Sequence, residues 1–257
     1  MKTIIIETMD DFSKMQHEEA AAQNNKCYYE VLIKHGVAII PKEAFKECLL
    51  LTRVIIPDSV TEIEEHAFEH CGIETIDIPY SITKIGWGAF KNCYWLTNVS
   101  LVAKINVIPG ECFAGTYIKT IAIPDSVTEI EPSAFECTQL EYFTIPDSVT
   151  RVWYKAFNKC SLLKDIKLSK NMTVIPFRCF ENCHRLESIE IPDSVTEIDS
   201  AFNYCRSLSE ITIPDSVTEI AYGAFRGTHI YPQDVPERFR NEETFSKGDL
   251  RDFNCYD

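Results

Sequence analysis

A phenylalanine recurs along this chain of 257 residues at an almost constant interval of 22 or 23 residues. The nine members of the series are Phe45, Phe68, Phe90, Phe113, Phe135, Phe157, Phe180, Phe202 and Phe225. Self-similarity at a fixed period is the signature of a stack of structural repeats, in which each repeat contacts mainly its neighbours. The chain is therefore predicted to fold as a solenoid of nine coils, numbered below by their phenylalanines.

An extended segment precedes the turn of each coil. In the segment that starts at Leu51, apolar residues occupy the first, fourth and sixth places, and the same frame returns in every coil. The last two of these places alternate with outward positions, as in a strand, and Pro57 ends the segment because proline has no N–H for a ladder. A second short extended piece, residues 60–63, follows the Asp-Ser turn. We expect the first segments to form one continuous parallel sheet, with strands about 4.8 Å apart.

Three coils depart from the common pattern. The coils of Phe45, Phe113 and Phe180 lack the Pro-Asp-Ser-Val-Thr turn and carry Ile-Pro shortly before the phenylalanine. One variant coil is thus followed by two standard coils, three times over. This order suggests that the gene grew by copying a three-coil unit.

The repeated motif is Ile-Pro-Asp-Ser-Val-Thr-Glu-Ile, followed by Ala-Phe and a Cys. It resembles the BspA-like class of leucine-rich repeats, and the resemblance covers about residues 28–230. The class implies an α/β repeat solenoid with a curved parallel β-sheet on one face and short extended or helical segments on the other. It also implies a non-enzymatic binding protein, often one associated with cell surfaces and adhesion.

Nine of the eleven cysteines lie within the repeat region. Six of them come three residues after the repeating phenylalanine, namely Cys48, Cys71, Cys93, Cys160, Cys183 and Cys205. Cys137 comes two residues after its phenylalanine. Disulfides between neighbouring coils are stereochemically conceivable, but a column of buried, reduced thiols is the favoured interpretation. Cys179, Cys183 and the adjacent His184 have a spacing compatible with chelation, although no Cys-x-x-Cys pair occurs. We expect no metal and no cofactor.

Catalytic signatures are missing as well, since the sequence has no glycine-rich phosphate loop, no Gly-x-Ser-x-Gly elbow and no zinc-protease helix. The formal net charge of −14 opposes binding to nucleic acid or anionic lipid. Residues 4–6 are too short an apolar run for a leader, which favours a cytoplasmic protein. We also expect the protein to be a monomer. The alternative is a surface or secreted protein from which a leader has been removed.

Two segments lie outside the repeat. Residues 1–27 are predicted to cap the first coil with a helix from Asp10 to about Asn24, begun by a capping box of Thr8 and Asp11 and turning Phe12 and Met15 inward. Residues 231–257 are predicted to be a polar extension or cap. The candidates for covering the last coil are Phe239, Phe245 and Phe253.

The outward positions of the predicted sheet differ from coil to coil while the frame stays constant, which is how a repeat surface can encode a partner. The candidate contact residues are Arg53, Ile55, Asp77, Asn98, Tyr142, Thr144, Asp165, Lys167, Glu190 and Glu210. Arg53, Ile55 and Tyr142 are preferred, because arginine and tyrosine are common anchors and an outward isoleucine suggests a patch. We interpret the chain as a protein–protein interaction scaffold. An adhesin for host or extracellular-matrix proteins is the alternative, and an inert mixed surface is the competing explanation for these residues.

Overall fold

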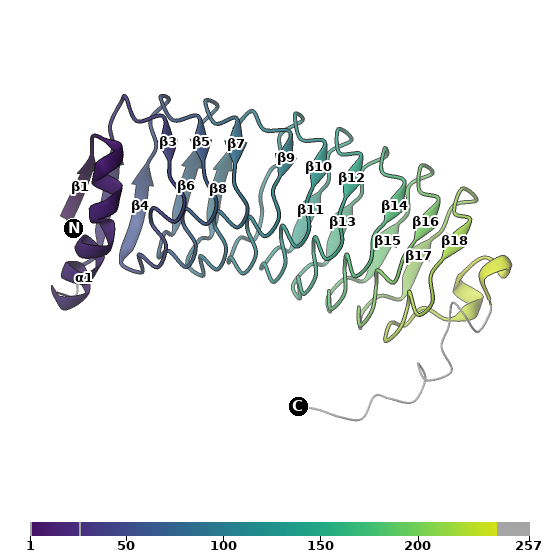
Figure 1. The fold of residues 1–257 in the computed structure, drawn as a ribbon. Helices are drawn as coiled ribbons and strands as arrows, with labels where there is room; N and C mark the ends of the chain where they lie inside the picture. The colour runs from purple at the N-terminus through teal and green to yellow at the C-terminus, as the bar shows by residue number, and fades with distance from the viewer. Residues whose placement is uncertain (1, 26, 241–257) are drawn as a thin grey trace.

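The computed structural model describes residues 2–25 and 27–240. The chain forms an elongated, gently curved solenoid, with a helix at its N-terminal end and two short helical turns at its C-terminal end (Figure 1). Each coil contains an extended segment that forms a longer strand in every coil but the fifth, a turn, one two-residue strand and the segment with the repeating phenylalanine. The predicted leucine-rich-repeat solenoid with parallel strands is confirmed, and its second segments are short strands.

The longer strands form what we call the long sheet. They are β2 (Tyr29–Ile33), β4 (Leu51–Ile55), β6 (Thr75–Ile78), β8 (Asn98–Leu101), β11 (Tyr142–Thr144), β13 (Asp165–Lys167), β15 (Ser188–Glu190) and β17 (Glu210–Thr212). The two-residue strands form the short sheet. They are β3 (Ile39–Ile40), β5 (Glu62–Ile63), β7 (Lys84–Ile85), β9 (Val107–Ile108), β10 (Glu129–Ile130), β12 (Arg151–Val152), β14 (Val174–Ile175), β16 (Glu197–Ile198) and β18 (Glu219–Ile220).

A column of stacked phenylalanine rings runs through the core. The nine repeating rings are buried, and neighbouring rings have centroids 5.0 to 6.0 Å apart and interplanar angles of 5° to 20°. A single coil could not bury such a ring, because the two faces of the ring are covered by the coils before and after it. The column therefore makes the coils depend on one another for burial of apolar area.

A second buried column lies three residues after the phenylalanines. The cysteine thiols in it donate to main-chain carbonyl groups of the preceding coil, as from Cys93 to Phe68 at 2.8 Å and from Cys205 to Phe180 at 2.9 Å. Three coils place threonine there instead, namely Thr116, Thr138 and Thr228, whose hydroxyls bond to the carbonyl three residues earlier. Small side chains with one donor therefore fill every coil at this place.

Cys137 does not belong to this column. Thr138 occupies the buried place in its coil, while Cys137 is exposed and has a left-handed backbone with φ of 59°. The same left-handed position recurs two residues after the other phenylalanines, as at Glu47 and Tyr204. The cysteines resolved by residues 2–25 and 27–240 are all free.

The long sheet is not continuous, and the expectation of one uninterrupted sheet is wrong. The ladder β1-β2-β4-β6-β8 ends at the fourth coil, and separate pairs β11-β13 and β15-β17 follow. Residues 119–123, in the fifth coil, form no strand, although the N–H of Glu141 still donates to the carbonyl of Lys119 at 3.1 Å, as equivalent residues do in other coils. Ile121 and Ile123 are half-buried, as are Ile211 and Ile213 in the ninth coil, whereas their counterparts Ile76 and Ile78 are buried.

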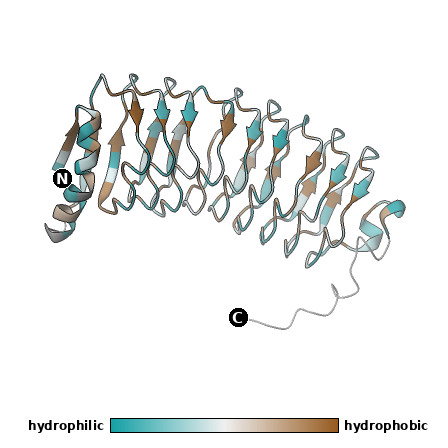
Figure 2. Ribbon diagram, viewed as in Figure 1, coloured by the Kyte–Doolittle hydropathy of each residue, from teal (hydrophilic) through white to brown (hydrophobic). Residues whose placement is uncertain are grey.

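The short sheet breaks before each internal variant coil. Its ladders are β3-β5-β7, β9-β10-β12 and β14-β16-β18, which match the three-coil unit seen in the sequence. The first strand of each ladder is hydrophobic, and these strands are the brown arrows β3, β9 and β14 among teal ones in Figure 2. In the six standard coils a threonine N–H after the turn bonds to the coil before; these residues are Thr61, Thr83, Thr128, Thr150, Thr196 and Thr218. The variant coils lack this turn, so each of them begins a new ladder.

The N-terminal segment covers the first coil with three elements. β1 (Lys2–Ile6) adds a parallel edge strand to β2, which the sequence did not predict. A 3-10 helix η1 (Met9–Lys14), begun by the capping box of Thr8 and Asp11, leads into α1 (Met15–Asn25). Phe12 and Met15 are buried as expected, and the Phe12 ring lies edge-on to Phe45, with centroids 5.6 Å apart.

The C-terminal end is covered by η2 (Pro232–Asp234) and η3 (Glu237–Phe239), in which Phe239 is buried. Arg238 reaches the last turn and lies 3.4 Å from the carboxylate of Asp215. Phe245 and Phe253 lie outside the described residues. The division at residues 27/28 and 230/231 stays a prediction.

Candidate functional site

The outward positions of the long sheet carry all ten candidate residues. Inward residues such as Ile76 and Phe143 are buried, and the residues on either side of them are exposed. Arg53, Ile55, Asp77, Asn98, Tyr142, Thr144, Asp165, Lys167, Glu190 and Glu210 are each exposed. We call this surface the long-sheet face. The structure places the residues as the alternation predicts, but their role in binding stays a prediction.

Strand register decides which of these side chains are neighbours. Tyr142 lies beside Asp165 and Thr144 beside Lys167, across the pair β11-β13. Arg53, on β4, and Glu210, on β17, stand near opposite ends of the solenoid and share no site. The ten residues therefore form a row and not a single cluster.

Two hollows flank the break in the long sheet. One of about 450 Å³ is lined by β6, β8 and residues 120–122, including Asp77 and Asn98. The other, of about 580 Å³, is lined by residues 120–123, Asp125, β11 and β13, including Tyr142 and Lys167. Ile121 contributes to both hollows. It was missed by sequence reasoning because it stands in the same frame as the inward isoleucines of other coils.

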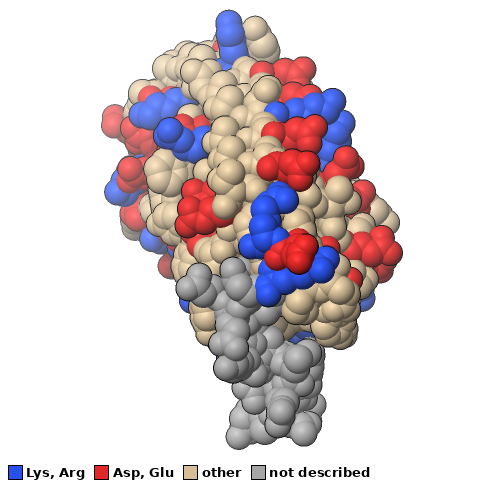
Figure 3. Space-filling model, turned by 90° about the vertical axis from the view of Figure 1, so that its right-hand side faces the viewer, with Lys and Arg blue, Asp and Glu red and all other residues tan. Residues whose placement is uncertain are grey.

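Charges of both signs surround the larger hollow. Lys164 lies 3.0 Å from Glu141 and 5.5 Å from the centre of the Tyr142 ring. The hydrogen bond from Lys164 lowers the pKa of Glu141, and the same contact raises the pKa of Lys164. Viewed from the C-terminal end, the surface likewise shows basic and acidic groups intermingled beside a band of uncharged residues (Figure 3). The face suits a partner with mixed polar and aromatic contacts better than a polyanion.

The buried thiols have low reactivity. Burial raises the pKa of Cys93 and of Cys160 to about 12, and it raises the pKa values of Cys179 and Cys183 well above the ordinary value. Since the thiolate is the nucleophile and the metal ligand, neither role suits these side chains near neutral pH. Within residues 2–25 and 27–240 no group of three or more His, Cys, Asp or Glu side chains is placed to hold a metal ion.

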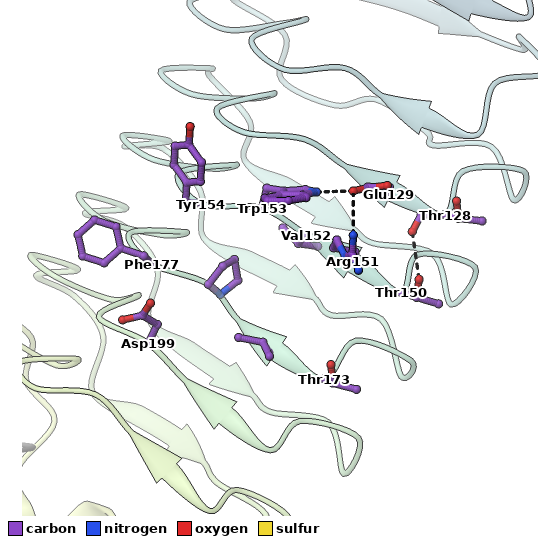
Figure 4. A pocket seen from close by; sticks show the side chains of 12 residues that line it. Thr128, Glu129, Thr150, Arg151, Val152, Trp153, Tyr154, Thr173, Phe177 and Asp199 are labelled. Carbon is purple, nitrogen blue, oxygen red and sulfur yellow. Dashed lines mark hydrogen bonds and ion pairs between the residues drawn. The ribbon is translucent and has the colours of Figure 1, made fainter.

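A further hollow of about 590 Å³ lies on the short sheet, between the sixth and seventh coils (Figure 4). Trp153, Tyr154 and Phe177 line it with Glu129, Arg151 and Asp199. Sequence reasoning singled out none of these residues. A signal was present, because aromatic residues stand three places before the repeating phenylalanine at Trp87, Tyr154, Phe177 and Tyr222.

Comparisons with known proteins agree with this architecture. A family model described as BspA type leucine rich repeat region matches residues 19–138 and 128–248, with six copies of the repeat. No curated protein matches the sequence significantly. No helix in the part of the chain that the structure describes is long and apolar enough to cross a membrane.

Solved structures similar to this chain include two bacterial proteins. A leucine rich cell surface protein from Faecalibacterium prausnitzii is 33% identical, with a TM-score of 0.56 over 82% of this chain and 60% of the other. The pneumococcal vaccine antigen PcpA is 22% identical, with a TM-score of 0.57 over 80% of this chain and 62% of the other, and this likeness concerns the fold alone. The chain thus spans about three fifths of the length of each of these two proteins.

Proposed function

The chain belongs to the BspA-type leucine-rich repeat family, and from this premise we propose that it is a cell-surface binding protein that holds a protein partner on the long-sheet face. The family supports a protein-interaction scaffold or adhesin in general terms. The partner and the contact face are our proposal. The scaffold architecture is typical of non-enzymatic proteins, and we propose that binding is the whole activity of the described region.

The observation that carries the choice of face is the break in the long sheet. It leaves two hollows side by side, with half-buried Ile121 between them and the exposed Tyr142 ring at one rim. Well-packed aromatic anchors beside small pockets dominate the energetics of most protein interfaces. Tyr142, Asp165 and Lys167 are therefore the proposed centre of the contact, and Arg53 and Glu210 lie too far along the solenoid to share it.

The surface location follows the relatives. The Faecalibacterium protein is described as a cell surface protein, which supports the surface alternative over the cytoplasmic location. An intracellular scaffold is the second candidate, favoured by the free cysteines of the described residues. A count of free thiols in protein alkylated rapidly at its native source separates the two: oxidised cysteines would exclude the intracellular scaffold, and nearly eleven free thiols would support it.

The contact face is tested by binding to a panel of purified extracellular-matrix proteins in biolayer interferometry. We expect Tyr142→Ala and Lys167→Glu to weaken binding to the matrix protein that is retained, each by about tenfold or more. Glu210→Ala, on the same sheet but away from the hollows, is the matched control and should bind as the wild type does. If no matrix protein is retained, the adhesin proposal fails. Equal binding by all variants would instead exclude the proposed face.

A further inference from the structure

Two equivalent junctions interrupt the short sheet, one between β7 and β9 and the other between β12 and β14. Each junction precedes a variant coil, so the coils on its two sides correspond residue by residue when aligned on their phenylalanines. One junction is closed by an aromatic ring and the other is open. The difference can be traced to single residues.

Trp87 closes the first junction by lying on Gly110 of the next coil. A Cβ atom at Gly110 would sit 2.1 Å from the Trp87 ring, so the contact requires glycine. The indole N–H donates to Glu111 at 3.3 Å and holds the ring in place. The ring thus covers the gap that the interrupted ladder leaves.

Bulkier residues occupy the second junction. Phe177 stands where Gly110 stands, three places before the phenylalanine, and Tyr154 takes the place of Trp87. Since a Cβ atom at Gly110 would collide with the Trp87 ring and Phe177 carries a Cβ at the equivalent place, Tyr154 cannot lie across the junction as Trp87 does. Trp153, in the place of Gly86, adds a third ring. The three rings are 38% to 46% exposed and surround the hollow of about 590 Å³, which we call the junction groove (Figure 4).

A deletion in the eighth coil keeps the groove open. Only two residues, Asp199 and Ser200, separate Ile198 from Ala201, whereas the other standard coils have three residues at this place. The hydrogen bonds put Ser200 at the place beside Phe177, because the N–H of Arg178 donates to the carbonyl of Ser200 at 3.0 Å, as the N–H of Lys155 donates to that of Phe177. A small serine therefore stands next to Phe177 on the C-terminal side. Asp199 instead lines the groove, with its carboxylate accepting the N–H of Ser200 at 2.6 Å.

The polar fringe of the junction groove is nearly balanced in charge. Glu129 accepts the indole N–H of Trp153 and lies 3.8 Å from Arg151, so these groups are fixed and their charges offset each other. The guanidinium of Arg151 lies 5.5 Å from the centre of the Trp153 ring. Oriented carboxylate and guanidinium groups beside exposed ring faces suit an uncharged ligand that presents C–H faces and hydroxyl groups together.

We propose that the junction groove binds a neutral oligosaccharide, with pyranose rings stacked on Trp153 and Phe177 and hydroxyl groups bonded to Glu129, Arg151 and Asp199. Adjacent coils are about 4.8 Å apart, a spacing close to the length of one sugar residue in an extended chain. Rings contributed by successive coils can therefore meet successive sugars. The formal net charge of −14 disfavours acidic polysaccharides. This site is separate from the long-sheet face and does not depend on the function proposed for it.

The test begins with the full chain on an array of neutral and acidic glycans, followed by calorimetry with the best neutral oligosaccharide. Trp153→Ala should weaken binding about tenfold, because one stacking ring is lost. The double variant Trp153→Gly with Phe177→Gly introduces the two glycines that the closed junction has at Gly86 and Gly110, and it should abolish binding. Tyr222→Ala is the matched control, since Tyr222 is 66% exposed at the corresponding place in the ninth coil. The urea midpoint of each variant shows whether it is folded.

Retention of neutral glycans by the wild type and by Tyr222→Ala, with the losses given above, would support the proposal. It is overturned if no neutral glycan binds with a dissociation constant below about 1 mM. Unchanged binding by Trp153→Ala would place the glycan elsewhere and would also overturn it. A decaproline peptide serves as a competing probe: if that peptide binds through Trp153 and glycans do not, the groove recognises a proline-rich peptide instead.

Discussion

Removal of one ring from the middle of the phenylalanine column tests whether the column couples the coils. Phe135 is 0% exposed and touches three rings: those of Phe113 and Phe157 with centroids 5.7 and 5.4 Å away, and that of Phe143 at 5.1 Å. Phe225, at the C-terminal end, is 3% exposed and stacks on Phe202 at 6.0 Å. Phe135 thus lies in the middle of the column, with a repeating ring on each side, whereas Phe225 is the last member of the series.

The expected magnitudes follow from these contacts. Truncation of a buried phenylalanine to alanine costs about 3 to 5 kcal/mol, and an aromatic pair contributes about 0.5 to 1.5 kcal/mol of such a value. Phe135→Ala should lie at the upper end, near 5 kcal/mol, because it loses three ring pairs and leaves a cavity closed on both sides. Phe225→Ala should lie at the lower end, near 3 kcal/mol, because the last coil has a neighbouring coil on one side only and can relax more readily.

Urea denaturation monitored by circular dichroism measures both costs. In a solenoid with nearest-neighbour coupling, Phe135→Ala should also split the transition, because the coils on either side lose their link. Phe225→Ala should keep a single main transition and fray the last coil only. If Phe225→Ala proves as costly as Phe135→Ala, or if Phe135→Ala costs less than about 1 kcal/mol, the column is not what joins the coils.

Three further predictions concern single side chains. The hydroxyl of Ser194 donates to a main-chain carbonyl of the variant coil before it at 2.6 Å, whereas the buried hydroxyl of Ser148 has no protein partner. Ser194→Ala should therefore lower the free energy of unfolding by about 1 kcal/mol and Ser148→Ala by less, as urea midpoints will show. Gly110→Ala should destabilise the protein by about 1 to 3 kcal/mol through its clash with Trp87, and a calorimetric melting temperature equal to that of the wild type would contradict this contact. Because burial raises the pKa of Cys160 to about 12, about one thiol in ten thousand is ionised at pH 8, and iodoacetamide with peptide mass spectrometry should label it far more slowly than the exposed cysteines.

Much of the fold was accessible from the sequence because the repeat is local in character. The phenylalanine period, the alternation along each strand and the prolines that follow it depend on residues only a few places apart, and the structure confirms the solenoid they predict. The misassigned Cys137 marks where this reasoning fails. A spacing of two instead of three places moves a side chain from the column to the surface, and Thr138 takes the buried place.

The candidate sites were less accessible. Alternation correctly placed Tyr142 and Lys167 on the outer side of the long sheet, but it could not reveal that Ile121 would be half-buried between two hollows. The junction groove depends on Phe177 replacing Gly110 and on a deletion near Asp199. Both are visible as irregularities in the sequence, yet their consequence appears only when adjacent coils are stacked.

The sequence by itself determined the number of coils, the inward and outward sides of each strand and the three-coil unit, because these follow from local periodicity. The tertiary structure alone decided where the ladders break and which side chains meet across the breaks. Those outcomes depend on hydrogen bonds and ring contacts between residues about one coil apart in the chain. Small differences in turn geometry decide whether such groups come within reach, and a repeating pattern does not record them.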